Sequence, residues 1–147
     1  MSKYSNICFY GGGAWGQALS ITLASLGHKS KLIVSDQTRA NEINSGISRR
    51  FSQITLSPLI TSSVNAKEVI KESNLVFITT ESKRVMSVIE QINLLNNKEI
   101  NIVITSKGFA NKHGETFNEI IQNQFPLQNY IFHNQPKQSL LHYQCIN

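Results

Sequence analysis

The sequence predicts an α/β fold, with a doubly wound, mostly parallel sheet that carries helices on both faces. Three observations predict it. Short apolar segments alternate with segments of about ten residues that have helical periodicity, which is typical of βαβ units with right-handed crossovers. The apolar segments are hydrophobic throughout rather than alternating, as in strands buried on both faces. A glycine-rich turn joins the first apolar segment to the first helical one.

The first predicted strand is Ile7–Tyr10, which ends at three consecutive glycines. A helix is expected from Ala14 to Leu26, and Gly27 is suited to end it because glycine readily adopts the left-handed conformation found at helix C-termini. A second strand is expected over Lys31–Ser35. The apolar face of the helix is expected to comprise Trp15, Leu19, Thr22, Leu23 and Leu26.

Asp36 stands where it can cap a short helix that runs to Asn44. Helical and strand periodicity fades over residues 45–58, which predicts a loop, and Ala66–Lys71 predicts one or two helical turns. Leu75–Thr79 is expected to be another buried strand. The helix after it is expected to bury Val85, Val88, Ile89 and Ile92.

Three further elements are expected: a strand over Ile100–Thr105, a helix over Glu115–Gln124 and a short strand over Tyr130–Phe132. Residues 133–147 differ from the rest, because they contain a single charged side chain and no glycine. We therefore expect one folded domain over residues 1–132, followed by a divergent and weakly ordered tail.

Composition excludes several classes of protein. The chain has 147 residues and a mass of 16.5 kDa, enough for one domain with a real core. It has no apolar run long enough to span a membrane and no secretory leader. Its net charge is +5, but the basic residues are scattered and form no basic stripe that would bind nucleic acid. We therefore expect a cytoplasmic protein that binds neither membrane nor nucleic acid. The histidines lack the spacing of a metal site, so no metal is expected. Cys8 and Cys145 are expected to be reduced thiols, and Cys8 is expected to be an inert core residue.

Gly11, Gly13 and Gly16 fit the pattern G-x-G-x-x-G at a predicted strand–helix junction, the setting in which this pattern binds dinucleotides. In a Rossmann-type fold the first glycine permits the tight turn, the second lets the pyrophosphate approach the backbone, and the third lets helix and strand pack closely. The helix N-terminus then offers free N–H groups to the phosphates. Asp36, about 20 residues further on, is placed to bind the ribose 2′-hydroxyl, to cap the next helix, or to do both.

The run from Ile7 to Leu19 resembles the start of the bacterial NAD(P)-dependent glycerol-3-phosphate dehydrogenases, and Gly27-His28 continues the likeness. Thr105-Ser106-Lys107-Gly108 is similar to the family's Ser/Thr-Lys-Gly motif. The resemblance covers about residues 5–132. It implies that NAD or NADP is the cofactor, bound by Gly11, Gly13, Ala14, Trp15, Gly16, Ser35, Asp36 and Lys107.

The resemblance also implies that Lys107 contacts the substrate, glycerol 3-phosphate. The implied reaction transfers a hydride between C2 of glycerol 3-phosphate and the nicotinamide ring and gives dihydroxyacetone phosphate, in the supply of glycerophospholipid precursors. A homodimer is compatible with the sequence. Trp15 is equally placed to pack beside the nucleotide or against the sheet.

Three departures from the family matter. Ser35 stands where members usually carry Arg or His, which favours NAD over NADP, although Arg39 could compensate. Glu81-Ser82 replaces the usual Pro-Ser, and a carboxylate facing the site would disfavour a phosphorylated substrate. After Phe132 the family continues into a helical domain with the proton-acceptor lysine and an Arg-Asn pair for glycerol phosphate, which this sequence lacks. We therefore expect a truncated or frame-shifted form that has no catalytic residue of its own and negligible turnover.

Two other functions remain open from the sequence. One is a dinucleotide-binding module without catalysis. The other is a different Rossmann-like enzyme, such as a methyltransferase that uses S-adenosylmethionine, although Ala14-Trp15 and Lys107-Gly108 argue against it.

Overall fold

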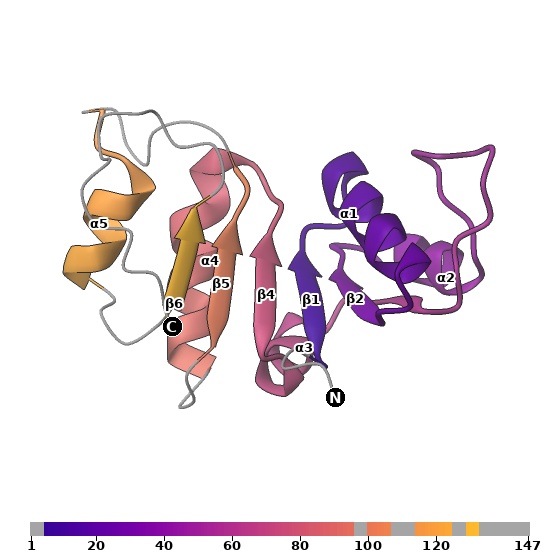
Figure 1. Cartoon of the computed structure of the whole chain (residues 1–147), viewed down its shortest axis with the longest axis horizontal. Coiled ribbons are helices and arrows are strands. Elements are labelled where there is room, and N and C mark those ends of the chain that lie inside the picture. Colours follow the sequence, from indigo (N-terminus) through magenta and orange to yellow (C-terminus); the bar gives the residue numbers. More distant parts are fainter. Residues whose placement is uncertain (1–4, 96–99, 107–113, 125–128, 133–147) are drawn as a thin grey trace.

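The computed structural model describes residues 5–95, 100–106, 114–124 and 129–132, and within them six parallel strands form one sheet (Figure 1). The strands are β1 (Ile7–Tyr10), β2 (Ser30–Ile33), β3 (Ile60–Ser63), β4 (Leu75–Ile78), β5 (Asn101–Ile104) and β6 (Asn129–Phe132). The helices are α1 (Ala14–Ser25), α2 (Gln37–Asn44), α3 (Ala66–Glu72), α4 (Ser82–Leu95) and α5 (Phe117–Gln124). The predicted α/β, Rossmann-type architecture is confirmed.

The strand order β3-β2-β1-β4-β5-β6 reverses between β1 and β4. The chain moves outward from β1 through β2 to β3 and then returns to the other side of β1 to form β4 (Figure 1). Tyr10, the last residue of β1, is paired with Ile33 on one side and Ile78 on the other, so three strands end level with one another. In open parallel sheets, ligands bind in the crevice at such a reversal.

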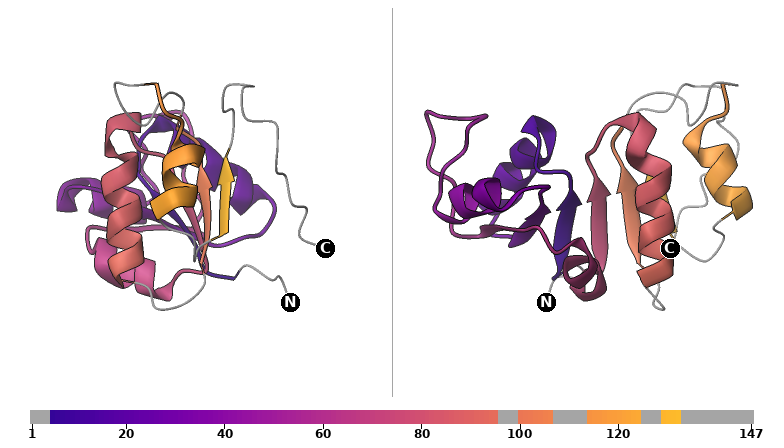
Figure 2. Two further views of the ribbon diagram at one scale, coloured as in Figure 1. Left: turned by 90° about the vertical axis from the view of Figure 1, so that its left-hand side faces the viewer. Right: turned by 180° about the vertical axis from the view of Figure 1, so that it is seen from behind.

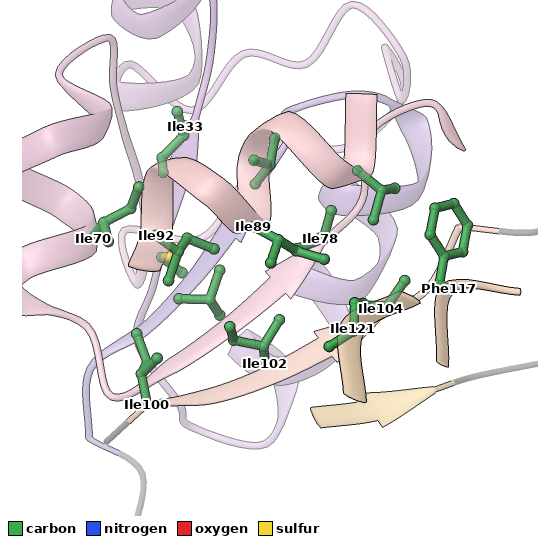
Figure 3. Close-up of a cluster of buried hydrophobic side chains, with 14 of the residues drawn as sticks. Ile33, Ile70, Ile78, Ile89, Ile92, Ile100, Ile102, Ile104, Phe117 and Ile121 are labelled. Atoms are coloured by element: carbon green, nitrogen blue, oxygen red, sulfur yellow. The ribbon is translucent and has the colours of Figure 1, made fainter. Parts of the chain in front are cut away.

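The larger apolar core lies between the sheet and α3, α4 and α5. Figure 2 shows α4 running along β4 and β5 on this face, and Figure 3 shows its isoleucines meeting those of the strands. Full burial of an aliphatic side chain of this size stabilises the fold by about 1.5–3 kcal/mol. The fully buried members include Ile70, Ile78, Ile89, Ile92, Ile100, Ile102, Ile104, Phe117 and Ile121.

A second core lies on the opposite face, under α1 and α2. Phe9 of β1 is fully buried there and stacks on Phe77 of β4, with ring centroids 4.9 Å apart. Ala40 and Ile43 of α2 close the cluster over Leu32. The two cores account for helices on both faces of the sheet.

The apolar face predicted for α1 is buried only in part. The buried residues of α1 are Gly16, Gln17 and Ser20, whereas Trp15 and Leu26 are 49% and 68% exposed. Small and polar residues face the sheet here because the glycine turn brings the start of the helix against backbone. Leu19 and Leu23 are only partly buried, and Thr22 is exposed.

Strand β3 was not predicted, because Ile60-Thr61-Ser62-Ser63 is mostly polar. The polar groups of β3 bind α2. The Ser62 hydroxyl donates to the Ala40 carbonyl at 2.9 Å, and the Ser62 N–H donates to the Asn44 side-chain oxygen at 2.7 Å. Strand β2 lies one to two residues earlier than predicted, and the other predicted elements are confirmed with small shifts at their ends. The predicted tail over residues 133–147 lies outside the described residues.

The end of α1 follows the prediction for Gly27. This residue has a φ of +83°, its N–H donates to the Ala24 carbonyl, and the N–H of His28 donates to the Leu23 carbonyl. That pair of bonds is the Schellman motif, which satisfies the last carbonyls of the helix. No helix within the described residues is both long and apolar enough to cross a membrane.

Candidate dinucleotide-binding site

The glycine turn closes over the reversal point between β1 and β4. Gly11 has a φ of +122°, a conformation that strains any residue with a side chain. The hydroxyl of Thr79, the residue after β4, donates to the Gly11 carbonyl at 2.8 Å, and the Thr79 N–H donates to the Tyr10 carbonyl at 3.0 Å. These bonds fix the turn where the two strands leave the sheet.

Gly13 and Gly16 have opposite surroundings. A Cβ on Gly16 would lie 2.1 Å from the Gly11 carbonyl oxygen, so only glycine allows α1 to approach the turn this closely. A Cβ on Gly13 would have no atom within 4 Å, and Gly13 is the N-cap of α1 without a capping side chain. The first amides of α1 therefore lie beside open space, as a bound phosphate requires. This arrangement fits the diphosphate of a dinucleotide.

Trp15 and Ala14, the first residues of α1, are exposed beside this space. The side chain of Trp15 is half exposed and belongs to neither apolar core, which favours the predicted place beside the nucleotide. The carboxyl end of β2 lies next to the turn as well, because the N–H of Gly11 donates to the Ile33 carbonyl at 3.3 Å. Ser35 and Asp36 follow this end and are exposed.

Asp36 caps α2 as predicted, because its carboxylate accepts the N–H of Arg39 at 2.8 Å. It also lines a cavity of about 320 Å³ together with Arg39, Arg49 and Arg50. Arg49 forms a two-pronged ion pair with Glu42, with N–O distances of 2.7 and 2.6 Å. The hydrogen bonds that Arg49 donates to Glu42, and secondarily the charge of Glu42, raise the pKa of Arg49, which keeps that guanidinium charged. We call the cavity lined by Asp36, Arg39, Arg49 and Arg50 the arginine cavity.

A buried hydrogen-bond chain links the glycine turn to the arginine cavity. The amide of Gln17 donates to the Gly12 carbonyl at 2.8 Å, and its oxygen accepts the Ser48 hydroxyl at 2.5 Å. The Ser48 oxygen in turn accepts the N–H of Arg50 at 3.1 Å and that of Phe51 at 2.9 Å. Gln17 and Ser48 are only 2% and 3% exposed. Sequence reasoning missed both; the one clue was a glutamine within the glycine-rich run.

The carboxyl ends of β4 and β5 are also joined. Thr105 donates its hydroxyl to the Ile78 carbonyl at 2.9 Å, and Ser106 donates to the Thr80 carbonyl at 2.6 Å. Lys107, which is predicted to contact both the cofactor and the substrate, lies outside the described residues. Glu81 is exposed and pairs with Lys83 at 2.8 Å; this contact lowers the pKa of Glu81 and offsets its charge.

Other candidate chemistry is limited in the part of the chain that the structure describes. No group of three or more His, Cys, Asp and Glu side chains there could hold a metal ion. Cys8 is buried in β1, and desolvation raises the pKa of its thiol to about 12, which confirms it as an unreactive core residue. Cys145 lies outside the described residues.

Comparison with known proteins gives one family. Residues 6–132 match the family model described as the NAD-dependent glycerol-3-phosphate dehydrogenase N-terminus. A glycerol-3-phosphate dehydrogenase [NAD(P)+] of Exiguobacterium is 32% identical over 119 residues, which cover 80% of this chain and 35% of the relative. Another, from Halothermothrix orenii, is 34% identical over 104 residues, and the match covers 30% of that relative. The chain thus spans about a third of the length of these relatives.

Solved structures agree on the fold. The crystal structure of glycerol-3-phosphate dehydrogenase from Coxiella burnetii superposes with a TM-score of 0.75 at 21% identity, over 86% of this chain and 39% of that one. At this level of identity the likeness shows the fold alone. The roles of individual site residues depend on the geometry described above.

Proposed function

Since the chain belongs to the NAD-dependent glycerol-3-phosphate dehydrogenase family, matched over residues 6–132, we propose that this domain binds NAD or NADP at the glycine turn. The observation that carries the proposal is the contrast between two glycines. Gly13 faces open space, whereas Gly16 has no room for a side chain. A turn that only linked a strand to a helix would need close packing at Gly16 but no open cradle at Gly13. The cradle is what a diphosphate requires.

Each residue of the proposed site has a separate part. Gly11 and Gly16 shape the turn, and Gly13 leaves the diphosphate free to approach. The first amides of α1, those of Ala14 and Trp15, donate to its oxygens. The Trp15 side chain, exposed beside the cradle, covers the bound nucleotide.

Ser35 and Asp36 lie at the adenosine end of the proposed site, because they follow β2 beside the turn. The Asp36 carboxylate already accepts one N–H, from Arg39, and has lone pairs left for a ribose hydroxyl. Its two predicted roles, helix cap and sugar ligand, are therefore compatible. Lys107 follows the carboxyl end of β5, where an ammonium group suits both the cofactor and a phosphorylated substrate.

The reaction proposed for the whole protein is hydride transfer between glycerol 3-phosphate and the nicotinamide, which is the electron-carrying group when bound. The residues described here bind and orient the cofactor, and we assign none of them as the general base that must take the hydroxyl proton. A homodimer, a cytoplasmic location and the lack of nucleic-acid and membrane partners stay predictions.

Fluorescence titration tests the proposal directly. Trp15 is the single tryptophan of the chain, so energy transfer from it to a reduced nicotinamide reports binding beside the cradle. We expect NADH or NADPH to bind the wild-type chain, and Gly13→Ala to weaken that binding at least about tenfold, or about 1.4 kcal/mol. Circular dichroism and urea unfolding should show that the variant remains folded.

Thr22→Ala is the matched control, because Thr22 is exposed on the same helix away from the turn. It should leave the affinity unchanged. A folded wild-type chain that binds neither nucleotide, or a Gly13→Ala variant that binds as tightly as wild type, would refute the proposed site.

A further inference from the structure

We propose that Gln17 and Ser48 are positioning residues for the bound diphosphate, because they hold the Gly12–Gly13 peptide bond with its N–H free for an anion. This inference rests on the proposed function and deepens it. The glycines give the turn its shape, but they do not decide which end of a peptide bond meets the phosphates. A carbonyl oxygen at the cradle would repel an anion, whereas an N–H attracts one.

The direction of the Gly12–Gly13 peptide bond is set from its carbonyl side. The Gly12 carbonyl accepts the side-chain amide of the buried Gln17 at 2.8 Å. The peptide bond is trans, so its C=O and its N–H point in opposite directions. The Gly13 N–H therefore points away from Gln17. Among the described residues no oxygen accepts this N–H, and a Cβ on Gly13 would have no atom within 4 Å.

Ser48 fixes which end of the Gln17 side chain faces Gly12. A serine hydroxyl can donate one hydrogen bond and accept two. The Ser48 oxygen accepts the N–H groups of Arg50 and Phe51, at 3.1 and 2.9 Å, so its own hydrogen is left for an acceptor. The side-chain oxygen of Gln17 is that acceptor, at 2.5 Å. The amide nitrogen of the same side chain must then face the Gly12 carbonyl, which it binds.

The other carbonyl oxygens of the turn are engaged as well. The Thr79 hydroxyl donates to the Gly11 carbonyl at 2.8 Å, and the backbone N–H of Gln17 donates to the Gly13 carbonyl at 3.0 Å. With the Gly12 carbonyl bound by the Gln17 side chain, all three carbonyl oxygens are satisfied within the protein. The turn therefore presents N–H groups to the cradle, and Gln17 makes two of the bonds that produce this arrangement.

Calorimetry with ADP-ribose tests the inference, because this probe carries the diphosphate without the nicotinamide. Gln17→Leu keeps a side chain of similar size but removes both side-chain hydrogen bonds, and we expect it to weaken binding at least about tenfold. Ser48→Ala frees the Gln17 side chain to turn over and should weaken binding about threefold. Ser20→Ala is the matched control, since it removes a buried serine hydroxyl that donates to the Gln17 backbone carbonyl within α1. It should leave the affinity unchanged.

A double variant separates positioning from a general loss of stability. Because Ser48 acts through the Gln17 side chain, Ser48→Ala should cause no further loss of affinity in the Gln17→Leu background. Losses that multiply in the double variant would refute the coupling. Urea unfolding shows that each variant is folded when its affinity is measured. If Gln17→Leu does not fold, the comparison of Ser48→Ala with Ser20→Ala decides, and equal affinities for these two would overturn the proposal.

Nuclear magnetic resonance observes the proposed donor itself. In the wild-type chain the amide proton signal of Gly13 should move downfield when ADP-ribose is added, as donation to a phosphate oxygen requires. If the folded wild-type chain binds neither ADP-ribose nor a reduced nicotinamide dinucleotide, the proposed function itself fails. If ADP-ribose binds but the Gly13 signal does not move, or if a folded Gln17→Leu variant binds as tightly as wild type, the site stands and the positioning role is refuted.

Discussion

Replacing Gly16 by alanine is the most stringent test of how the turn is built. The added Cβ would lie 2.1 Å from the Gly11 carbonyl oxygen and 2.9 Å from the Thr79 hydroxyl oxygen. Neither atom can move aside alone, because the Thr79 hydroxyl donates to that same carbonyl at 2.8 Å. The start of α1 would have to move away from β1 by roughly 1 Å to restore an ordinary van der Waals contact.

This movement disrupts two hydrogen bonds: the one from Thr79 to Gly11, and the one from Gln17 to the Gly12 carbonyl. Each contributes about 1 kcal/mol net, and overpacking of a tight contact costs about 1–3 kcal/mol more. We therefore expect Gly16→Ala to lower the free energy of unfolding by about 3–5 kcal/mol. That is a large share of the roughly 5–15 kcal/mol that stabilises an ordinary domain.

Urea unfolding followed by far-ultraviolet circular dichroism measures this loss. Gly13→Ala is the matched control, because it adds the same methyl group at a place with no atom within 4 Å. Its free energy of unfolding should stay within about 1 kcal/mol of wild type, since the methyl group meets nothing and stiffens the unfolded chain. A Gly16→Ala variant as stable as Gly13→Ala would refute the close-packing argument.

Two further changes have defined outcomes. Burial raises the pKa of Cys8 from 9.0 to about 12, so the folded chain keeps a thiol proton that the unfolded chain releases. This contribution to stability is complete below pH 9 and falls by up to about 1.4 kcal/mol per pH unit between pH 9 and 12. Cys8→Ala should therefore make the free energy of unfolding less dependent on pH in that window. The same slope for the variant and the wild-type chain would count against the raised pKa of Cys8. Gly27→Ala should cost about 1 kcal/mol, because its φ of +83° disfavours a side chain; thermal melting would detect this, and an unchanged midpoint would contradict the left-handed cap.

Most of the fold could be predicted from the sequence, because most of its strands are short apolar runs and its longest described helix, α4, buries apolar residues at helical spacing. Leu75–Ile78 and the isoleucines of α4 are examples, and both are deeply involved in the larger core. The failures occur where polar residues are buried and satisfied by long-range bonds. Ser62 in β3 and Gln17 in α1 are of this kind, since their partners lie 22 and 31 residues away in Ala40 and Ser48.

The site divides in the same way. Gly11, Gly13 and Gly16 follow a local pattern, so their surroundings could be anticipated from spacing alone. The arginine cavity could not, because Arg49 and Arg50 sit in a loop without periodicity and reach Asp36 only through the folded shape of residues 45–58. Charge at a site made by an irregular loop has no sequence pattern to reveal it.

The central place of β1 has a consequence for synthesis on the ribosome. Domains tend to fold from the N-terminus as the chain emerges, and β2 and β3 can join one side of β1 early. The opposite side of β1 must wait for β4, which begins only at Leu75. Until then the nascent chain exposes the unpaired backbone of an apolar strand, the kind of edge on which other chains aggregate. A translational pause before β4 has left the ribosome would therefore prolong the time in which this edge is open to aggregation.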